Sequence, residues 1–342
     1  MRFGLGLWPR QAPAESGRLA AVAEAAGFDA VWVPDERFYR DCYLTLASVA
    51  QATRRVRLGP CVTDPYSRHP ALTAVAVATL DELAAGRAVL GIGAGVSGFA
   101  ALGLTRDRPA VAIHEAVALV RRLWSGEAVT QPGRVVRFHG GQLDFPARPI
   151  PVFVAGRGPR ILEVAGEIAD GVIIGALASP PLLAYALGHV ARGAARAGRH
   201  PDRVETILWL HTALGPDAAA ARDAVRPIVV GVLVSSAPVL DRLGIGLPDG
   251  LRAELAGLTY TAHSPEVDRV ARRVPDDVLA HFTMAGDGAH CRAVTARLAA
   301  AGVTQLAIVP WLVPRQTLEH FITAFAREVI APARTRPGSY AG

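Results

Sequence analysis

Lysine is absent from this chain of 342 residues, and the chain contains 36 arginines. The absence excludes a Walker A phosphate loop, a Schiff-base aldolase and a lysine-bound pyridoxal phosphate, because each of these needs a lysine amine. The formal net charge of +6 could suggest nucleic-acid binding, but the arginines are scattered and lack interleaved aromatic residues. We expect a solvated basic surface and no nucleic-acid partner, with a few arginines serving an anionic cofactor or substrate.

Cysteine is scarce as well, with three residues at positions 42, 61 and 291. Their odd number and wide spacing favour neither a disulfide framework nor a thiolate zinc site. Long hydrophobic runs are also lacking, because none reaches the roughly 18 residues of a membrane-spanning helix. The first residues, MRFGLGLW, are typical of a strand and not of a secretion signal. We therefore expect a cytoplasmic protein with no metal site and no membrane partner.

The chain does contain a large apolar fraction, 51% of its residues, in an alternation of short strands and helices. The expected strands cover residues 2–7, 30–33, 56–62, 88–92, 152–155, 171–174, 206–214 and 305–309. This alternation predicts a parallel sheet, and eight units without a dividing linker favour an α/β fold of the (β/α)8 TIM-barrel type over an open doubly wound sheet. We expect one domain over residues 1–331, with a hairpin excursion at 125–148, a helical insertion at about 217–280 and a flexible tail at 332–342.

A first glycine-rich turn, GIGAGVSG at residues 91–98, follows the fourth expected strand. It fits a Rossmann dinucleotide motif poorly, because that motif follows the first strand and has an acidic residue about 20 residues later. Glycine here either serves tight turns or brings backbone N–H groups close to a planar or phosphorylated ligand. The candidates for cofactor binding are Gly93, Ala94, Gly95 and Ser97.

A second glycine-rich turn, VAGRGPR at residues 154–160, joins a strand to a helix. Proline suits the first turn of a helix, and a helix N-terminus presents unpaired N–H groups to an anion. Phosphate binding is one interpretation, and an ordinary strand-to-helix turn is the other. The candidate residues are Ala155, Gly156, Arg157, Gly158 and Pro159.

A third cluster, CVTDPYSRHP at residues 61–70, begins at the end of the third expected strand. It holds Asp, Tyr, Ser, Arg and His within a short span. Active sites of TIM barrels lie at the carboxyl ends of the strands, which favours a functional interpretation of the cluster. A lone histidine before proline, as at His69, is also common as a purely structural residue.

At these three places the chain resembles the bacterial luciferase-like oxidoreductase superfamily, in particular the deazaflavin-dependent branch typified by methylenetetrahydromethanopterin reductase. The matching stretches are WVPDE and residues 57–99, 151–175 and 301–310. The resemblance implies a TIM barrel that forms a homodimer or homotetramer and holds coenzyme F420, or alternatively FMN, at the strand ends. It also implies a non-prolyl cis peptide at Cys61-Val62, next to Thr63, that backs the cofactor ring.

The proton donor departs from the family pattern. Relatives often carry a carboxylate at the end of the first strand, where this chain has Gly6-Leu7-Trp8-Pro9. They commonly have Asp-His where it has Asp35-Glu36, and Asn where it has Asp64. Asp35, Glu36 and Asp64 are therefore alternative catalytic acids, since carboxylates near one another can keep one protonated near neutrality. The residues expected in the substrate pocket are Trp8, Tyr66 and His69.

The leading functional hypothesis is hydride transfer between coenzyme F420 and a small organic substrate, with reduction of C=N or an activated C=C, although the reverse oxidation is equally allowed. One alternative is an FMN-dependent monooxygenase that uses dioxygen. Another is a non-catalytic flavin-binding barrel. A hydrolase is disfavoured, because neither GxSxG nor HExxH occurs in the chain.

Overall fold

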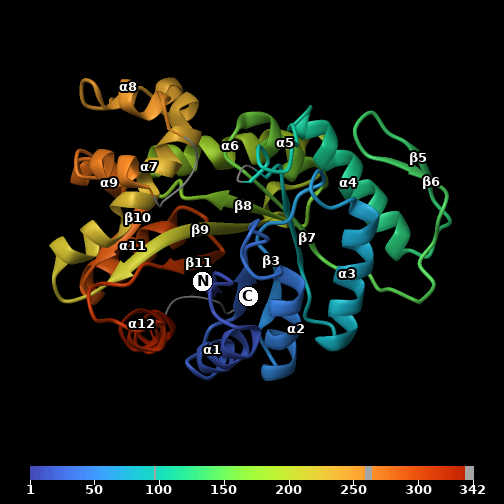
Figure 1. Cartoon of the computed structure of the whole chain (residues 1–342), viewed down its shortest axis with the longest axis horizontal. Coiled ribbons are helices and arrows are strands. Elements are labelled where there is room, and N and C mark those ends of the chain that lie inside the picture. The colour runs from blue at the N-terminus through green and yellow to red at the C-terminus, as the bar shows by residue number, and fades with distance from the viewer. Residues whose placement is uncertain (96–97, 259–263, 336–342) are drawn as a thin grey trace.

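A barrel of parallel strands surrounded by helices forms the centre of the computed structural model, which describes residues 1–95, 98–258 and 264–335 (Figure 1). Around the barrel the strands follow the order β3 (Arg57–Pro60), β2 (Ala30–Val33), β1 (Arg2–Gly6), β11 (Gln305–Pro310), β9 (Glu205–Leu214), β8 (Gly171–Gly175), β7 (Val152–Gly156) and β4 (Leu90–Gly93). Two parallel bridges, Leu58 to Ala88 and Thr63 to Ile92, close the ring between β3 and β4. The predicted TIM barrel is confirmed.

Helices connect the strands and cover the outside of the barrel. They are α1 (Pro13–Ala25), α2 (Cys42–Ala52), α3 (Pro70–Leu83), α4 (Pro109–Trp124), α5 (Pro159–Ile168), α6 (Pro180–Arg196), η1 (Pro201–Arg203), α11 (Gly288–Ala300), α12 (Leu318–Phe325) and the π-helical turn η2 (Ala326–Ile330). Proline opens α1, α3, α4, α5 and α6. Its ring fixes a helical φ, and its missing N–H is not needed in a first turn, so these helix starts are encoded locally.

Strand β10 (Thr283–Gly286) was not expected from the sequence. It pairs in parallel with residues 211–214 of β9 and lies outside the ring of eight strands. Its sequence, TMAG, is short and contains two small residues, so it carries little strand pattern of its own. Pairing with the long strand β9 holds it in place.

Two segments depart from the regular barrel. Residues 125–148 contain an antiparallel hairpin of β5 (Thr130–Pro132) and β6 (Arg137–His139), as expected. Between β9 and β10 the described residues form helices at one side of the barrel (Figure 1). These are α7 (Ala218–Leu243), α8 (Leu251–Ala256), α9 (Pro265–Ala271) and α10 (Asp276–Ala280). The start of the predicted tail is helical in α13 (Ala331–Thr335), and the rest of the tail lies outside the described residues.

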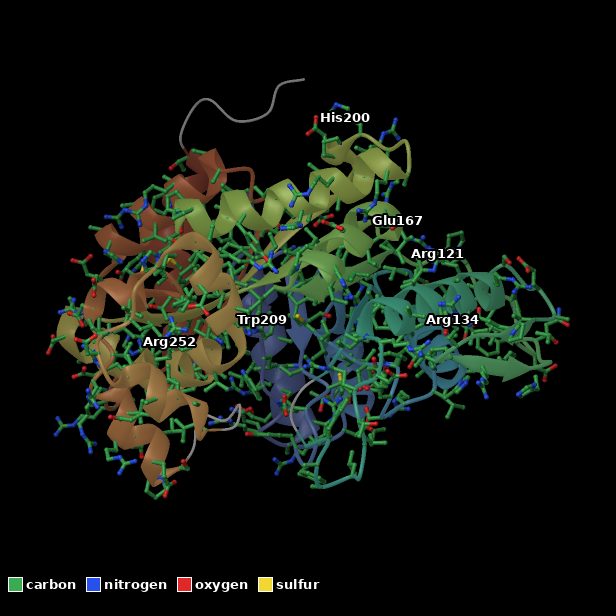
Figure 2. All side chains as sticks on the ribbon, turned by 90° about the horizontal axis from the view of Figure 1, so that it is seen from above. Arg121, Arg134, Glu167, His200, Trp209 and Arg252 are labelled. Atoms are coloured by element: carbon green, nitrogen blue, oxygen red, sulfur yellow. The ribbon has the colours of Figure 1, made fainter. Side chains whose placement is uncertain are left out.

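Alternate residues of each strand point into the barrel. The inward-pointing residues are mostly apolar, so the barrel interior is apolar. Trp209 lies near the middle of the molecule in the view from above (Figure 2). Its ring fits because β1 has a glycine at position 6, where a Cβ atom would stand 2.7 Å from the Trp209 ring. Val62, Ala155 and Trp209 pack against the buried interior and remain partly exposed. These three residues are called the apolar floor below. The buried residues beneath them are Ala30, Trp32, Cys61, Val89, Phe153, Ile173, Ile207 and Ala307.

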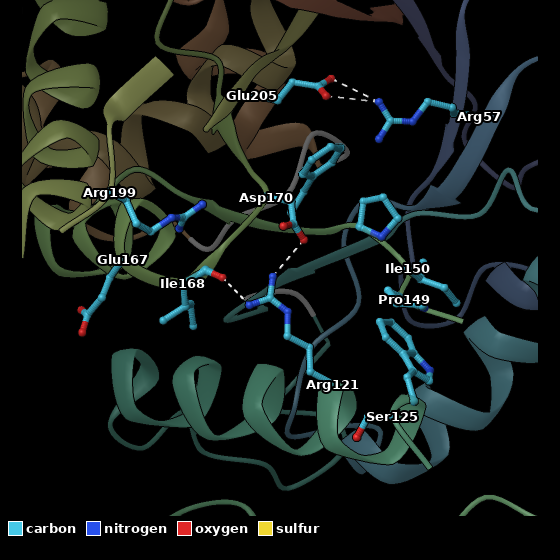
Figure 3. A pocket seen from close by; sticks show the side chains of 13 residues that line it. Arg57, Arg121, Ser125, Pro149, Ile150, Glu167, Ile168, Asp170, Arg199 and Glu205 are labelled. Atoms are coloured by element: carbon cyan, nitrogen blue, oxygen red, sulfur yellow. Dashed lines mark hydrogen bonds and ion pairs between the residues drawn. The ribbon is translucent and has the colours of Figure 1, made fainter. Parts of the chain in front are cut away.

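A cavity of about 890 Å³ opens at the amino ends of the strands (Figure 3). Ion pairs cross it, with Arg57 3.2 Å from Glu205 and Arg121 2.8 Å from Asp170. The positive and negative charges that line this cavity therefore largely neutralise one another. TIM-barrel active sites lie at the opposite end of the strands, so we place the candidate site there and assign these ion pairs to stability.

No helix in residues 1–95, 98–258 and 264–335 is long and apolar enough to cross a membrane. In the same residues no group of three or more His, Cys, Asp or Glu side chains is placed to hold a metal ion. All three cysteines are free and buried.

Candidate active site

The chain turns at the carboxyl end of β3 through a cis peptide bond between Cys61 and Val62, as the resemblance implied. Cys61 is buried in the barrel, and Val62 is part of the apolar floor. Gly93 of β4 lies directly against this turn, because a Cβ atom there would stand 2.8 Å from Val62 Cγ2. Ala94 and Gly95 continue from β4, and Gly95 has a φ of +62° that favours glycine. The candidate Ser97 lies outside the described residues.

Asp35 follows β2 and is tied to the neighbouring strand end. The Thr63 hydroxyl donates a hydrogen bond of 2.7 Å to Asp35 Oδ2. The charge of the same carboxylate also acts on Tyr43 of α2. Burial raises the pKa of the Tyr43 phenol, and the Cys42 thiol and the Asp35 charge raise it further. At neutral pH the Tyr43 hydroxyl is therefore a proton-bearing group.

Glu36 differs from the other two acid candidates, because its carboxyl group makes no hydrogen bond or ion pair with the described residues. The pKa of Glu36 is raised to about 7, chiefly by burial; the Arg37 charge partly opposes this rise, and the Asp35 charge contributes to it. A carboxyl group with a pKa near 7 is about half protonated at neutral pH. Such a group can both give and accept a proton during turnover.

Asp64 is fully engaged by its own loop. Its Oδ1 atom accepts hydrogen bonds from the backbone N–H groups of Tyr66 and Ser67, both at 2.8 Å. Its Oδ2 atom accepts the Ser67 hydroxyl at 2.6 Å and pairs with the Arg37 guanidinium. Arg37 in turn lies over the Phe99 ring, 5.0 Å from its centroid. These contacts hold Asp64 in its loop, whereas the Glu36 carboxyl group has no such partner among the described residues.

Trp8 and Tyr66, two candidates for the substrate pocket, lie on different loops. Trp8 follows β1, is partly exposed and packs against Tyr39 with ring centroids 5.5 Å apart. Tyr66 donates a hydrogen bond of 2.6 Å to the carbonyl oxygen of Asp107. It thereby ties the loop after β3 to the segment that precedes α4.

His69, the third candidate, caps helix α3. Its Nδ1 atom accepts the backbone N–H of Ala71 at 3.2 Å, and its Nε2 atom lies 2.9 Å from the carbonyl oxygen of Arg137 in the hairpin. Both ring nitrogens are therefore used by backbone groups. These two contacts join the start of α3 to the hairpin.

The turn from Gly156 to Pro159, called the glycine turn below, joins β7 to α5. A Cβ atom at Gly156 would stand 2.5 Å from Ile161, whereas one at Gly158 would meet nothing within 4 Å. Space is therefore open in front of the first N–H groups of α5, whose N-cap supplies no side chain. Arg157 is held by protein groups, because Nε donates to the Gly175 carbonyl at 2.7 Å and Nη1 donates to Ser235 Oγ of α7 at 2.6 Å.

Sequence reasoning missed His211 of β9. Its side chain is buried, and the Trp311 indole N–H donates to its Nδ1 atom at 3.1 Å. Burial, with a smaller contribution from the Arg157 charge, lowers the pKa of His211 to about 3, so the ring is neutral. The alternation of strand residues could have identified it, since His211 lies on the same face of β9 as Ile207 and Trp209, which point into the barrel.

The carboxyl end of this barrel thus combines an apolar floor, an unpaired carboxyl group with a raised pKa and an open glycine turn at a helix N-terminus. Such an arrangement is suited to a TIM-barrel oxidoreductase whose cofactor is planar and carries an anionic tail.

Comparison with known proteins identifies the family. Residues 1–305 match the family model described as luciferase-like monooxygenase, and the chain belongs to this family. It is 33% identical over 333 residues to a 5,10-methylenetetrahydromethanopterin reductase of Methanolobus tindarius, covering 96% of this chain and 100% of the relative. An F420-dependent glucose-6-phosphate dehydrogenase of Kineococcus radiotolerans is 30% identical, over 93% of each chain. The solved coenzyme F420 dependent tetrahydromethanopterin reductase from Methanopyrus kandleri superimposes with a TM-score of 0.84 at 31% identity, covering 97% and 99% of the two chains.

Proposed function

We propose that this chain is an oxidoreductase that transfers a hydride between coenzyme F420 and a small organic substrate, with reduction of a C=N or activated C=C bond as its reaction. The observation that carries the proposal is the placement of the apolar floor and the open glycine turn at the same end of the barrel. Relatives named for F420 match the chain over nearly its whole length, which supports the choice of this cofactor.

The residues present fit a planar deazaflavin with a phosphate-bearing tail. Val62 and Trp209 offer apolar surface to a ring, and Gly93 allows Val62 to approach β4 closely. Gly158 leaves the N-terminus of α5 open to an anion, and Arg157 adds positive charge beside it. When bound, F420 supplies the hydride. The chain itself orients the ring and the substrate and supplies the group that transfers the proton.

Glu36 is the residue that we assign to proton transfer. Reduction of a C=N bond consumes a proton in addition to the hydride. Glu36 has a pKa raised to about 7 by burial and no fixed partner among the described residues. Asp35, held by the Thr63 hydroxyl at 2.7 Å, keeps a second carboxylate beside it. Proton release from Glu36 is therefore possible near neutral pH, where an ordinary glutamic acid is already ionised.

A binding experiment tests the proposal. The purified protein is titrated with F420 and, separately, with FMN, and ligand fluorescence is measured. We expect micromolar affinity for F420 and none for FMN. Binding of FMN alone would overturn the proposal and would favour the monooxygenase.

We propose further that the protein is a homo-oligomer of the cytoplasm. Helices α2 and α3 expose an apolar stripe formed by Leu44, Leu72, Val75 and Leu83. Positions 72, 75 and 83 fall on one face of α3, with the exposed Thr79 between the last two. A second copy of the chain would cover it. Sedimentation should show a dimer or tetramer, and the double variant L72E/V75E should shift it toward the monomer.

A further inference from the structure

We infer that His211 is a substrate-binding residue whose Nε2–H group donates a hydrogen bond to an uncharged or anionic oxygen, such as a carbonyl oxygen, of the substrate. The inference rests on the proposed function, because it assumes that a substrate lies above the apolar floor.

The position of His211 follows from the register of β9. His211 is two residues beyond Trp209, so it projects from the same face one layer closer to the carboxyl end of the barrel. Its backbone is fixed on both sides, since it pairs with Val309 of β11 and with Thr283 of β10. β9 lies across the barrel from β3, four places away in the strand order. His211 therefore faces the site from the side opposite the Cys61–Val62 turn.

The proton of the His211 ring is placed by Trp311. The indole N–H donates to Nδ1 at 3.1 Å, and the two rings meet edge to face at 5.9 Å. Because Nδ1 accepts, the proton of the neutral ring is on Nε2. The His211 side chain is 1% exposed, and Nε2 makes no hydrogen bond with the described residues. Nε2 is not among the fully buried, unpartnered polar atoms of the described residues, so it keeps some accessible surface at which a ligand oxygen can accept its hydrogen bond.

The surroundings of His211 determine what it can bind. The charged neighbour that acts on it is Arg157, whose guanidinium also bonds to Gly175 and Ser235. A nearby positive charge disfavours a charged imidazole and a cationic ligand group alike. The neutral ring can donate through Nε2, while its acceptor atom is already occupied by Trp311. The site is therefore suited to an oxygen acceptor and not to a cation or a hydrogen-bond donor.

Nitrogen-15 NMR of the histidine rings tests the inference in the protein loaded with oxidised F420. The H211Q variant identifies the His211 signals among those of the ten histidines. At pH 7 we expect a neutral ring protonated on Nε2. Acetone, the carbonyl probe, should shift the Nε2–H proton resonance downfield, and tetramethylammonium, the cationic control, should leave it in place.

A ring protonated on Nδ1, a charged ring, or an equal response to both probes would overturn the inference. The W311F variant provides a second measurement, because loss of the indole donor should let the proton redistribute between the two ring nitrogens. F420 binding, followed separately by fluorescence, distinguishes the two failures. No F420 binding by the wild type overturns the proposed function, whereas normal binding with an unresponsive His211 overturns only this inference.

Discussion

The Arg37 guanidinium pairs with the Asp64 carboxylate, whose side chain is completely buried. The same guanidinium donates to the carbonyl oxygen of Asp35 at 2.8 Å, so one side chain joins the ends of β2 and β3. Arg37 directly follows Glu36 in the chain. Its anchoring therefore also fixes the backbone that carries the proposed proton donor.

Removal of Arg37 should strongly destabilise the fold. The R37M variant leaves the buried Asp64 carboxylate without its ionic partner, and breaking a buried pair in this way costs about 3–5 kcal/mol. Chemical denaturation measures the loss. R18M is the matched control, because Arg18 also pairs with carboxylates but does so on the surface, and it should change stability little. Similar behaviour of the two variants would show that the Asp64 pair is not important for stability.

Glu36 should control the pH dependence of the reaction. In the reductive direction the protonated form acts, so kcat/KM should fall as the pH rises through about 7. E36Q should remove this limb and lower kcat/KM by roughly 10²–10⁴. The affinity for F420, measured by fluorescence, should stay close to that of the wild type. A variant that keeps the limb would assign the proton to another group.

The same carboxyl group should affect stability. The folded chain holds a proton on Glu36 up to a pKa of about 7, whereas the unfolded chain releases it near the ordinary value of 4.5. The free energy of unfolding therefore falls as the pH rises through this window. E36Q lacks the titration, so its stability relative to the wild type should increase between pH 4.5 and 7. Denaturation at three pH values checks the sign, which would be reversed if Glu36 had a stabilising cationic partner.

Gly158 should separate cofactor binding from folding. G158A adds a methyl group where the protein itself leaves space, so stability should change by less than about 0.5 kcal/mol. The same methyl group would occupy the space in front of α5 and should weaken F420 binding about tenfold, or 1.4 kcal/mol. G188A on α6 is the control, since its Cβ atom would meet only Arg192 Nη1, at an ordinary contact distance of 3.7 Å, and lies on a different helix from the glycine turn. Equal F420 affinities for both variants would remove the glycine turn from the cofactor site.

Ser235 should matter for the cofactor although it lies on a different helix. S235A removes the acceptor for Arg157 Nη1, and a hydrogen bond to a charged group is worth about 1.5–3 kcal/mol. We expect F420 to bind at least several-fold more weakly. S236A is a close control, because the neighbouring Ser236 hydroxyl is buried and makes no hydrogen bond in the described structure. Loss of affinity in S236A but not in S235A would contradict the role of this contact.

The barrel was predictable because its signals are local. Prolines open helices such as α3 and α5, and β-rich runs separate them, so the order of the elements follows from the sequence. β10 escaped prediction for the opposite reason. Its residues 283–286 have weak strand character, and pairing with β9 decides their conformation.

The site was predictable only in part. Glycine turns and strand-end acids are visible as motifs, which identified Gly158 and Glu36. The difference between Glu36 and Asp64 is not visible in this way, because it depends on a tertiary contact between Arg37 and Asp64. His211 was missed because its partner Trp311 is 100 positions away in the chain.

The closure of the ring between β3 and β4 has a further consequence. Isolated bridges at Leu58 and Thr63 hold this junction, whereas β9 and β11 pair over six residues. The proposed cofactor site lies on both sides of the junction, at Val62 and Gly93. A ligand that contacts both residues would join β3 and β4 where the barrel has the fewest strand-pairing contacts. The thermal stability of the protein would then depend on how much of it has the cofactor bound. Above saturation, each tenfold increase in free F420 should add about 1.4 kcal/mol to the free energy of unfolding.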